Sequence, residues 1–571
     1  ALLLAGCQVI GGIEVRDPYV PPDMAASGEG GAGADKPSAG SAGKAANGGS
    51  SAGATVVEGG AGGVSTPGGA GAGADGGAAE GGSGAVEPAV CGDGEQQPGE
   101  VCDDGAENGT STHCDTSCLF VCPDACPLRV DPAIETPGDG SSWDKALASL
   151  QAAVTAQQSA GAGEVWVKQG VFTATAAGTL LTLGSSVAIY GGFAGTEQTL
   201  SERPAPSEAT VTVLDANQLA YPALRGAGGA VLDGFMVKNA TGPGGSALTS
   251  TAITGLVLRH VWFKDNASTG SSNCGGALVL TGGGEARLEA CRFEGNSSEG
   301  VGGAICLNGT ASTLTIDRTT FVDNHAAASG GALYAFGTYS PSRVPTIHVT
   351  ASTFIGNATT THEMTGGALY VSNALLDVTD SDFMSNSAMV AEGAAIFCET
   401  DAKCPIVNST FVKNLGFRAA VSGSSPDLKV VNSTFAFNDE QCPDHCDVSN
   451  STFAALQNSV LVQTDKIHMQ STGGQVMGFN NCSIFTSGGL GSKPSPFVEP
   501  LVDTDGNGVP EYLLSQPASN DCLDAGDDAY ADAANIAWDM LTTSANNCLD
   551  VAPIDAGRHY RPTTANPAMC K

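Results

Sequence analysis

The sequence is poor in charged, aromatic and basic residues. Asp, Glu, Lys and Arg make up 15% of the 571 residues, and Phe, Trp and Tyr make up 6%. A chain with so few large side chains cannot fill one broad globular core, so it favours a narrow repetitive core joined to low-complexity linkers. Only 24 residues are basic against 59 that are acidic, giving a formal net charge of -35. This charge predicts no nucleic-acid partner, whereas it suits solubility, divalent cations or a basic ligand.

The apolar run that opens the sequence is too short to span a bilayer. It ends in Leu4-Ala5-Gly6-Cys7, which resembles the lipobox of bacterial lipoproteins. The resemblance implies that residues 1–7 end a lipoprotein signal and that Cys7 carries lipid, which makes the membrane a partner through a lipid anchor. Gln8, where retained lipoproteins have Asp, implies a lipid-anchored place in the cell envelope, at the outer membrane or cell surface. The alternative is an ordinary secretory signal with a chance cysteine.

Gly, Ala and Ser make up almost all of residues 25–88. Such a composition cannot bury enough apolar surface to offset the loss of chain entropy on folding. We therefore predict that residues 8–88 are a disordered tether. As a flexible coil, the low-complexity part spans roughly 40–50 Å from end to end.

Residues 89–128 are rich in cysteine. They contain Cys91-Gly92-Asp93-Gly94 and Gly99-Glu100-Val101-Cys102-Asp103-Asp104-Gly105, followed by Cys114 and Cys118. The pattern resembles the cysteine-rich repeat of myxobacterial surface proteins, although Ser111-Thr112-His113 replaces the usual Gly-Asp-Gly. So small a segment lacks a core and needs disulfides, and the local clustering of the 18 cysteines indicates an oxidising compartment.

Two alternating motifs repeat through the C-terminal part of the chain. One motif is Gly-Gly-Ala followed by Leu or Ile, beginning at Gly275, Gly302, Gly330 and Gly366. A pair of glycines suits a corner that needs unusual dihedral angles or close backbone approach. The other motif is Phe-x-x-Asn, with these pairs: Phe263 and Asn266, Phe293 and Asn296, Phe321 and Asn324, Phe354 and Asn357, Phe383 and Asn386, Phe411 and Asn414, Phe435 and Asn438.

The residues before each phenylalanine indicate short strands. Apolar residues stand five and seven positions before it, which places both on one face of a strand. Each repeat is therefore one coil of short strands separated by turns. Stacked coils would align the phenylalanines inside and the asparagines as a ladder at a turn. The asparagines could instead form a row that binds ligand. We expect the series to continue to a degenerate copy at Phe453, with Val448 and Cys446 before it.

The paired motifs resemble the repeats of chlamydial polymorphic outer-membrane proteins, over residues 256–453. The segment before them resembles the start of bacterial pectin-lyase-like β-helices, with a short capping helix expected over residues 145–156. These resemblances imply an all-β fold, a right-handed parallel β-helix (pectin-lyase-like solenoid) with a short N-terminal capping helix, preceded by the disordered linker and the disulfide-rich module. We assign the β-helix to residues 129–515 and a C-terminal closing segment to residues 516–571. Two local disulfides are expected, Cys398–Cys404 and Cys442–Cys446.

One segment has the oxygen ligands of a metal site. Asp503, Asp505 and Asn507 alternate as in calcium loops, so calcium is the candidate cofactor, although Leu514 stands where an EF-hand needs Glu. A surface turn is the alternative. No catalytic motif is recognisable, and His260 and His325 fall at turns of the repeat, where a surface position is the expectation.

The architecture favours a non-enzymatic cell-surface lipoprotein for adhesion or for binding an extracellular glycan or surface protein. The alternative is a carbohydrate-active polysaccharide lyase or glycoside hydrolase of the β-helix fold. That alternative requires Asp, Glu and Arg clustered on one lateral face of adjacent coils. A third hypothesis is a structural envelope component, with an even surface and no saturable ligand.

Overall fold

The computed structural model describes residues 126–485, except for 220, 246, 272–273, 310–311, 338–343, 362–363, 389–392, 400, 417–418, 437, 439–445, 451–452, 458, 464–468, 472–474 and 480–481. The predictions for the lipid signal, the tether, the closing segment and nearly all of the cysteine-rich module lie outside these residues.

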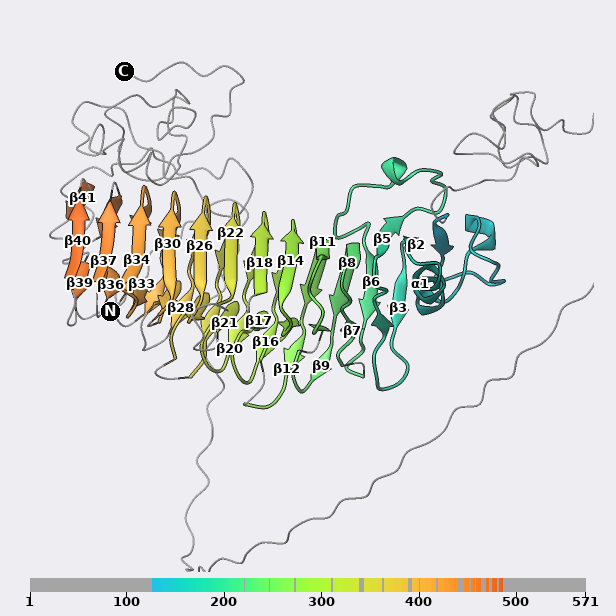
Figure 1. Cartoon of the computed structure of the whole chain (residues 1–571), viewed down its shortest axis with the longest axis horizontal. Helices are drawn as coiled ribbons and strands as arrows, with labels where there is room; N and C mark the ends of the chain where they lie inside the picture. Colours follow the sequence, from blue (N-terminus) through green and yellow to red (C-terminus); the bar gives the residue numbers. More distant parts are fainter. Residues whose placement is uncertain are drawn as a thin grey trace, which may run out of the picture. The chain divides into compact units, whose positions relative to one another are not determined.

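The described strands stack in parallel as successive coils of one solenoid (Figure 1). Over residues 231–423, each coil passes through a wide bent sheet, then a narrow sheet, then a third sheet, before it returns to the first one level further along. Parallel crossover connections are right-handed in nearly all proteins. The chain is thus an all-β, right-handed parallel β-helix with few helices.

The bent sheet contains β1 (Leu128–Val130), β2 (Gly163–Lys168), β3 (Val171–Thr173), β5 (Val187–Phe193), β6 (Thr212–Asp215), β8 (Val231–Lys238), β11 (Leu256–Lys264), β14 (Gly284–Glu289), β15 (Arg292–Glu294), β18 (Ser312–Asp317), β19 (Thr320–Val322), β22 (Thr346–Thr350), β23 (Thr353–Ile355), β26 (Leu375–Thr379), β27 (Asp382–Met384), β30 (Lys403–Val407), β31 (Thr410–Val412), β34 (Asp427–Val431), β35 (Thr434–Ala436), β37 (Phe453–Gln457), β38 (Val460–Gln463), β40 (Gln475–Phe479) and β41 (Cys482–Phe485). The narrow sheet contains β9 (Thr241–Gly242), β12 (Ala267–Ser268), β16 (Ser297–Ser298), β20 (His325–Ala326), β24 (Ala358–Thr359), β28 (Ser387–Ala388) and β32 (Leu415–Gly416). The third sheet contains β4 (Leu181–Thr182), β7 (Leu224–Arg225), β10 (Leu248–Ser250), β13 (Leu278–Leu280), β17 (Ile305–Asn308), β21 (Leu333–Phe336), β25 (Leu369–Ser372), β29 (Ile396–Cys398), β33 (Ala419–Gly423), β36 (Cys446–Asn450) and β39 (Met469–Ser471).

Three corners recur in successive coils, and a residue with positive φ makes each of them. The first corner bends the wide sheet, the second follows it, and the third precedes the third sheet. At the third corner the Gly-Gly motif is explained by two different constraints. Gly302 has φ +64, and Gly303 lies so close to the carbonyl of Gly331 in the next coil that a Cβ would not fit. First-corner residues are His260, Ala290, Arg318, Ala351, Asp380, Asn408 and Asn432.

The phenylalanines of the repeat form a continuous stack in the core. All seven are fully buried, and neighbouring rings lie nearly parallel with centroids 4.6 to 4.9 Å apart. Offset stacking of aromatic rings adds to the free energy gained by burying their apolar surface. The stack therefore ties each coil to the coils on either side of it.

The asparagines of the repeat form a second buried ladder, beside the second corner. Within it, Asn324 Nδ2 donates to the carbonyl of Phe293 and to Oδ1 of Asn357, both at 2.9 Å. Asn324 Oδ1 in turn accepts from the backbone N–H of Asn296 at 3.1 Å and from its Nδ2 at 2.9 Å. All seven amides are fully buried, so this ladder satisfies backbone and side-chain groups inside the wall and is not a row open to ligand.

A helix closes the N-terminal end of the stack. The expected helix over residues 145–156 is wrong in its bounds: η2 (Trp143–Lys145) is a single 3-10 turn, and α1 (Leu150–Ser159) begins where the Ser149 hydroxyl accepts from the N–H of Ala152. Leu147 instead pairs with Val130 in an isolated parallel bridge. The shift arises because the chain first completes this bridge to β1, and Ser149 then supplies the N-cap. At one end of the stack, α1 covers the first coils (Figure 1).

The expected continuation of the repeat to Phe453 is also wrong. Phe435 pairs in register with Leu461, so Leu461 occupies the next position of the ladder, while Phe453 begins β37 and pairs with Gln475. Cys446 begins β36 of the third sheet, opposite Ala419. The physical reason is path length, because the 18 residues from Phe435 to Phe453 are too few for a circuit that takes 24 to 33 residues in the earlier coils.

Two disulfides reinforce the described coils. Cys398–Cys404 forms as predicted, and Cys274–Cys306 joins neighbouring coils. Cys291 is a free, buried thiol. The predicted pair Cys442–Cys446 involves Cys442, which lies outside the described residues.

Candidate functional site

The outward side chains of the bent sheet change character along the stack. The first outer row, before the first corner, is charged and aromatic in the early coils and becomes Thr and then Val in later ones. In register, it runs Arg129, Trp166, Tyr190, Asp233, Arg259, Glu289, Asp317, Thr350, Thr379, Val407 and Val431. The second outer row, after the first corner, changes from charged to apolar one coil earlier, between Glu294 and Val322. It runs Asp215, Lys238, Lys264, Glu294, Val322, Ile355, Met384, Val412 and Ala436.

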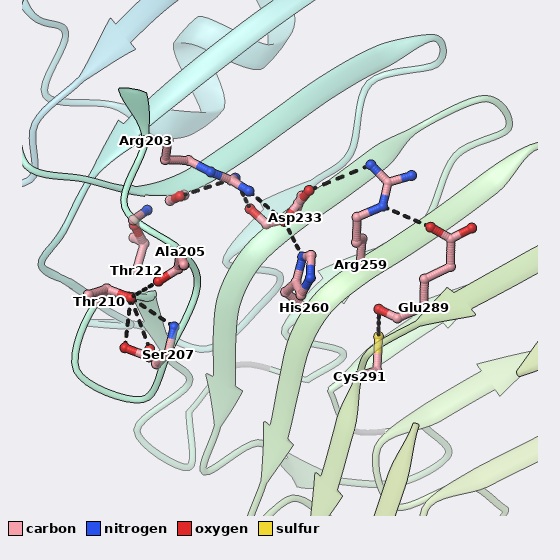
Figure 2. Close-up of polar contacts among 12 residues, drawn as sticks. Arg203, Ala205, Ser207, Thr210, Thr212, Asp233, Arg259, His260, Glu289 and Cys291 are labelled. Atoms are coloured by element: carbon pink, nitrogen blue, oxygen red, sulfur yellow. Dashed lines mark hydrogen bonds and ion pairs between the residues drawn. The ribbon is translucent and has the colours of Figure 1, made fainter. Parts of the chain in front are cut away.

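Asp233 is the centre of the charged part of this face. Its side chain is only 4% exposed, yet it has three cationic or imidazole neighbours. Arg203 Nη2 lies 3.0 Å from Oδ1, His260 Nδ1 lies 3.1 Å from the same oxygen, and Arg259 Nη1 lies 3.7 Å from Oδ2. Figure 2 shows the three side chains converging on the carboxylate from the β5–β6 connection and from β11. Arg259 Nε also donates to Glu289 at 2.8 Å, which carries the network into the next coil.

The contacts within this network favour the charged forms of its members. Burial alone would raise the pKa of Asp233, but the hydrogen bond with His260 and the nearby Arg203 guanidinium outweigh it, so the pKa lies below its ordinary value. The hydrogen bond between Arg259 and Glu289 lowers the pKa of Glu289 and raises the pKa of Arg259. Both carboxylates are therefore ionised at neutral pH, and Arg259 is held as a cation.

The connection between β5 and β6 supplies the part of the site that does not belong to the repeat. Glu197 fixes this connection, because its carboxylate accepts backbone N–H bonds from Ala194, Gly195 and Thr196 at 2.7 to 2.9 Å. Trp143 Nε1 donates to the Glu197 carbonyl at 2.9 Å. A connection held this firmly can present Arg203 to the sheet in a defined position, and the guanidinium also lies 5.5 Å above the ring of Tyr190.

A shallow pocket of about 200 Å³ lies after the first corner of the same coils. Trp262 supplies an aromatic surface, and Glu294 accepts from Lys264 Nζ at 2.9 Å and from Arg292 Nε at 2.8 Å. Burial would raise the pKa of Glu294, but these two hydrogen bonds lower it below its ordinary value. The full lining is Glu208, Met236, Trp262, Phe263, Lys264, Arg292 and Glu294.

The carboxylates of the charged face are paired with cationic side chains. Among the described residues, no group of three or more His, Cys, Asp and Glu side chains is placed to hold a metal ion. The carboxylates of Asp233, Glu289 and Glu294 are instead engaged by cations. Burial raises the pKa of the Cys291 thiol to about 12, which excludes a thiolate nucleophile there at neutral pH. His260 is the one member of the network that combines a partly exposed ring, at 37%, with a buried orienting carboxylate.

The predicted functional residues and the observed face do not coincide. The Phe and Asn ladders are buried, while Cys7, Asp503, Asp505 and Asn507 lie outside the described residues. The sequence motifs did not identify Asp233, Arg259 and Trp262, because those motifs describe the inward-facing positions of the repeat. The signal that could have found them is in the outward positions, read coil by coil in register.

Comparison with known proteins adds the following. Residues 255–435 match a family model described as a right-handed β-helix region. A pectate lyase structure covers 70% of this chain and 92% of its own, at 13% identity and a TM-score of 0.38. The A-module of a mannuronan C-5 epimerase from Azotobacter vinelandii covers 63% and 100%, at 11% identity and a TM-score of 0.30. A tailspike protein of E. coli bacteriophage HK620 covers 65% of each chain, at 11% identity and a TM-score of 0.28.

No curated protein sequence matches the chain significantly. Within the described part of the chain, no helix has the length and apolar character needed to cross a membrane.

Proposed function

We propose that this β-helix is a cell-surface module that binds a neutral glycan on the charged half of its outer face, in the pocket beside Trp262. The observation that carries the proposal is the combination in one pocket of an aromatic surface with paired cationic and carboxylate groups. A sugar ring offers apolar C–H groups that pack on an aromatic ring, while its hydroxyl groups both donate and accept hydrogen bonds.

The charge balance favours a neutral ligand over a polyanion. Lys264 and Arg292 face Glu208 and Glu294 in the pocket lining, so their charges offset one another. The whole chain has a formal net charge of -35, which adds long-range repulsion of anionic polymers. Hydrogen bonds between ionised groups and sugar hydroxyls give orientation without requiring a charged ligand.

The test is binding of the full chain to an array of neutral and uronic-acid-containing oligosaccharides, followed by titration calorimetry on the best ligand. Trp262→Ala and Arg292→Ala should each weaken binding by about tenfold or more, because aromatic and Arg contacts dominate interfaces of this kind. Thr320→Ala is the matched control, since Thr320 pairs in register with Arg292 one coil further along. Equal affinity of all four proteins, or no binding to any array member, would refute the proposal.

A carbohydrate-active enzyme is the second candidate, and one observation favours it. The cluster of Asp, Glu and Arg on the lateral face of adjacent coils that this hypothesis requires is present around Asp233, and it includes His260 oriented by a buried carboxylate. Incubation with polysaccharides, with assays for new reducing ends and for unsaturated ends, tests it. Activity that is lost in His260→Gln and kept in His348→Gln would establish it, because His348 is a half-exposed histidine of the same face.

We further propose that the module is displayed at the cell surface by a lipid on Cys7 and by the glycine-rich tether. This rests on the resemblance of Leu4-Ala5-Gly6-Cys7 to a lipobox. Expression of the full-length gene in a bacterial host should place the protein in the membrane fraction, and Cys7→Ala should release it to the soluble fraction. An unchanged distribution would contradict lipid anchoring at this position.

A further inference from the structure

One coil of the bent sheet differs from the others in how its two arms are joined at the first corner. Two residues join β2 to β3, and two residues join the arms in every coil from β14 and β15 to β34 and β35. Strands β8 and β11 each pass through the corner without a break. Between β5 and β6, in contrast, the connection has 18 residues, 194–211. A long insertion on a regular scaffold is a common position for functional residues.

The β5–β6 connection folds over the outer face of the sheet. Arg203 Nη2 lies 3.0 Å from Oδ1 of Asp233, on the first arm of β8. The following loop is held by Thr210, whose Oγ1 donates to the carbonyl of Ala205 at 2.9 Å (Figure 2). Glu208 of the same loop is exposed and lines the pocket on the second arm. The connection therefore crosses the first corner on the β8 side of the pocket.

The pocket beside Trp262 is closed on this side and open on the other. Along the stack its lining comes from β8, β11 and β15 in that order, through Met236, Trp262 and Arg292. At the β8 end the connection adds Glu208, and Met236 is only 7% exposed. At the β15 end the next residue in register is Thr320, which is partly exposed. The two-residue corner between β18 and β19 leaves no loop that could rise over it.

We propose that the pocket takes the end of a neutral glycan chain, and that the rest of the chain leaves over β15 and β19 toward the later coils. The inference rests on the glycan binding proposed above, and it adds which part of the glycan is recognised. An internal sugar residue carries the chain on both sides, so its site must be open at both ends. A terminal residue needs one open side only, and it has one more free hydroxyl group.

Glu208 is the residue that we expect to recognise this additional hydroxyl group. Its exposed carboxylate can accept a hydrogen bond at the closed side, and hydrogen bonds to ionised acceptors are stronger than those between neutral groups. The hydrogen bond with Glu294 and, to a lesser extent, the charge of Glu208 raise the pKa of Lys264. Lys264 is therefore held as a cation that offsets the charge of Glu208, so the closed side does not require a charged ligand.

Binding stoichiometry on glycans of different length tests the proposal with the full chain. The probes are linear α-glucan, mannan and galactan, with any further neutral glycan that binds on the array, each in a short and a long fraction. Where the long chains have about ten times as many sugar residues, calorimetry should find about tenfold fewer bound protein molecules per gram, because each gram holds fewer chain ends.

Two variants test the closed side itself. Glu208→Ala should weaken binding of the short fraction by about tenfold. Glu285→Ala is the matched control, since Glu285 is an exposed carboxylate of β14 and does not line the pocket. Replacing residues 204–209 by a pair of glycines opens the closed side, so short and long fractions should then bind equal numbers of protein molecules per gram. If this shortened protein does not fold, the wild-type comparison decides alone.

The results that contradict the proposal differ from those that contradict glycan binding. Equal numbers of wild-type molecules per gram of short and long chains would overturn recognition of the chain end and leave glycan binding in place. Unchanged affinity in Glu208→Ala would overturn the role of Glu208. The absence of binding to every neutral glycan would remove the proposed function, and this inference with it.

Discussion

Replacing one interior asparagine of the buried ladder tests how much the ladder stabilises the solenoid. Asn324→Ala removes four hydrogen bonds, two that the amide donates and two that it accepts. Each buried bond contributes about 1 kcal/mol net, so the free energy of unfolding should fall by about 4 kcal/mol. Where the former hydrogen-bond partners of Asn324 cannot bind water inside the wall, the free energy of unfolding should fall further.

The position at the start of the ladder provides a graded comparison. The Asn266 amide donates to Val237 and Asn296 and accepts only from the N–H of Ala240, so it takes part in three such bonds. Asn266→Ala should therefore cost about 3 kcal/mol, and Thr315→Ala, an outward and partly exposed position, should change stability by less than about 0.5 kcal/mol.

The assay is urea unfolding followed by circular dichroism, with the slope of the transition compared among variants to check that the same surface is exposed. The reasoning fails if Asn324→Ala loses less than about 1 kcal/mol. It also fails if the interior and first positions respond in the reverse order.

Four other predictions follow from the same geometry. Phe321→Ala should lower the free energy of unfolding by about 3–5 kcal/mol, since it leaves a cavity between rings whose centroids lie 4.8 and 4.6 Å away; calorimetry would measure it, and a loss below about 1 kcal/mol would contradict a stack that supports the core. Because the folded-state pKa values of Asp233, Glu289 and Glu294 are lowered, their stabilisation is present above the unfolded values of about 4 and is lost as pH falls through the folded values. In Asp233→Asn the acid-side dependence of stability should be shallower, and an unchanged profile would mean that the carboxylate contributes nothing. Replacing Cys274 and Cys306 together by Ser should cost about 2–4 kcal/mol, because the bond closes a loop between residues 32 apart; equal melting of wild type and variant under oxidising conditions would argue against this. If Asp503, Asp505 and Asn507 hold calcium, adding the ion should raise the melting temperature in wild type and not in Asp503→Asn, whereas an identical response would remove the site.

The coil architecture could be predicted from the sequence because its determinants are local and repeated. Every copy of the motif has Phe and Asn three residues apart, and the Gly-Gly motif marks a corner where both backbone angle and space are restricted. The extension to Phe453 failed because a similar short motif was read without checking path length. Strand pairing puts Leu461, an ordinary aliphatic residue, in the ladder position.

The charged face could not be predicted in the same way, because it depends on which outward positions of different coils become neighbours. Asp233 and Arg259 are 26 residues apart, and they meet only because β8 and β11 pair in one particular register. Arg203 comes from a connection outside the repeat, whose path no periodicity specifies. The sequence contains these residues, but their proximity is a property of the stacking.

The ladders also make the number of coils an adjustable dimension of the molecule. Within the stack, each Phe and Asn of the described ladder contacts mainly its counterparts one level away, so a coil duplicated after β19 would find the same contacts that its parent has. Each such duplication would lengthen the stack by about 4.8 Å and leave the Trp262 pocket untouched. The length of the stack and the lining of the pocket can therefore change independently. Duplication within the repeat changes the length, and substitutions on a few early coils change the pocket.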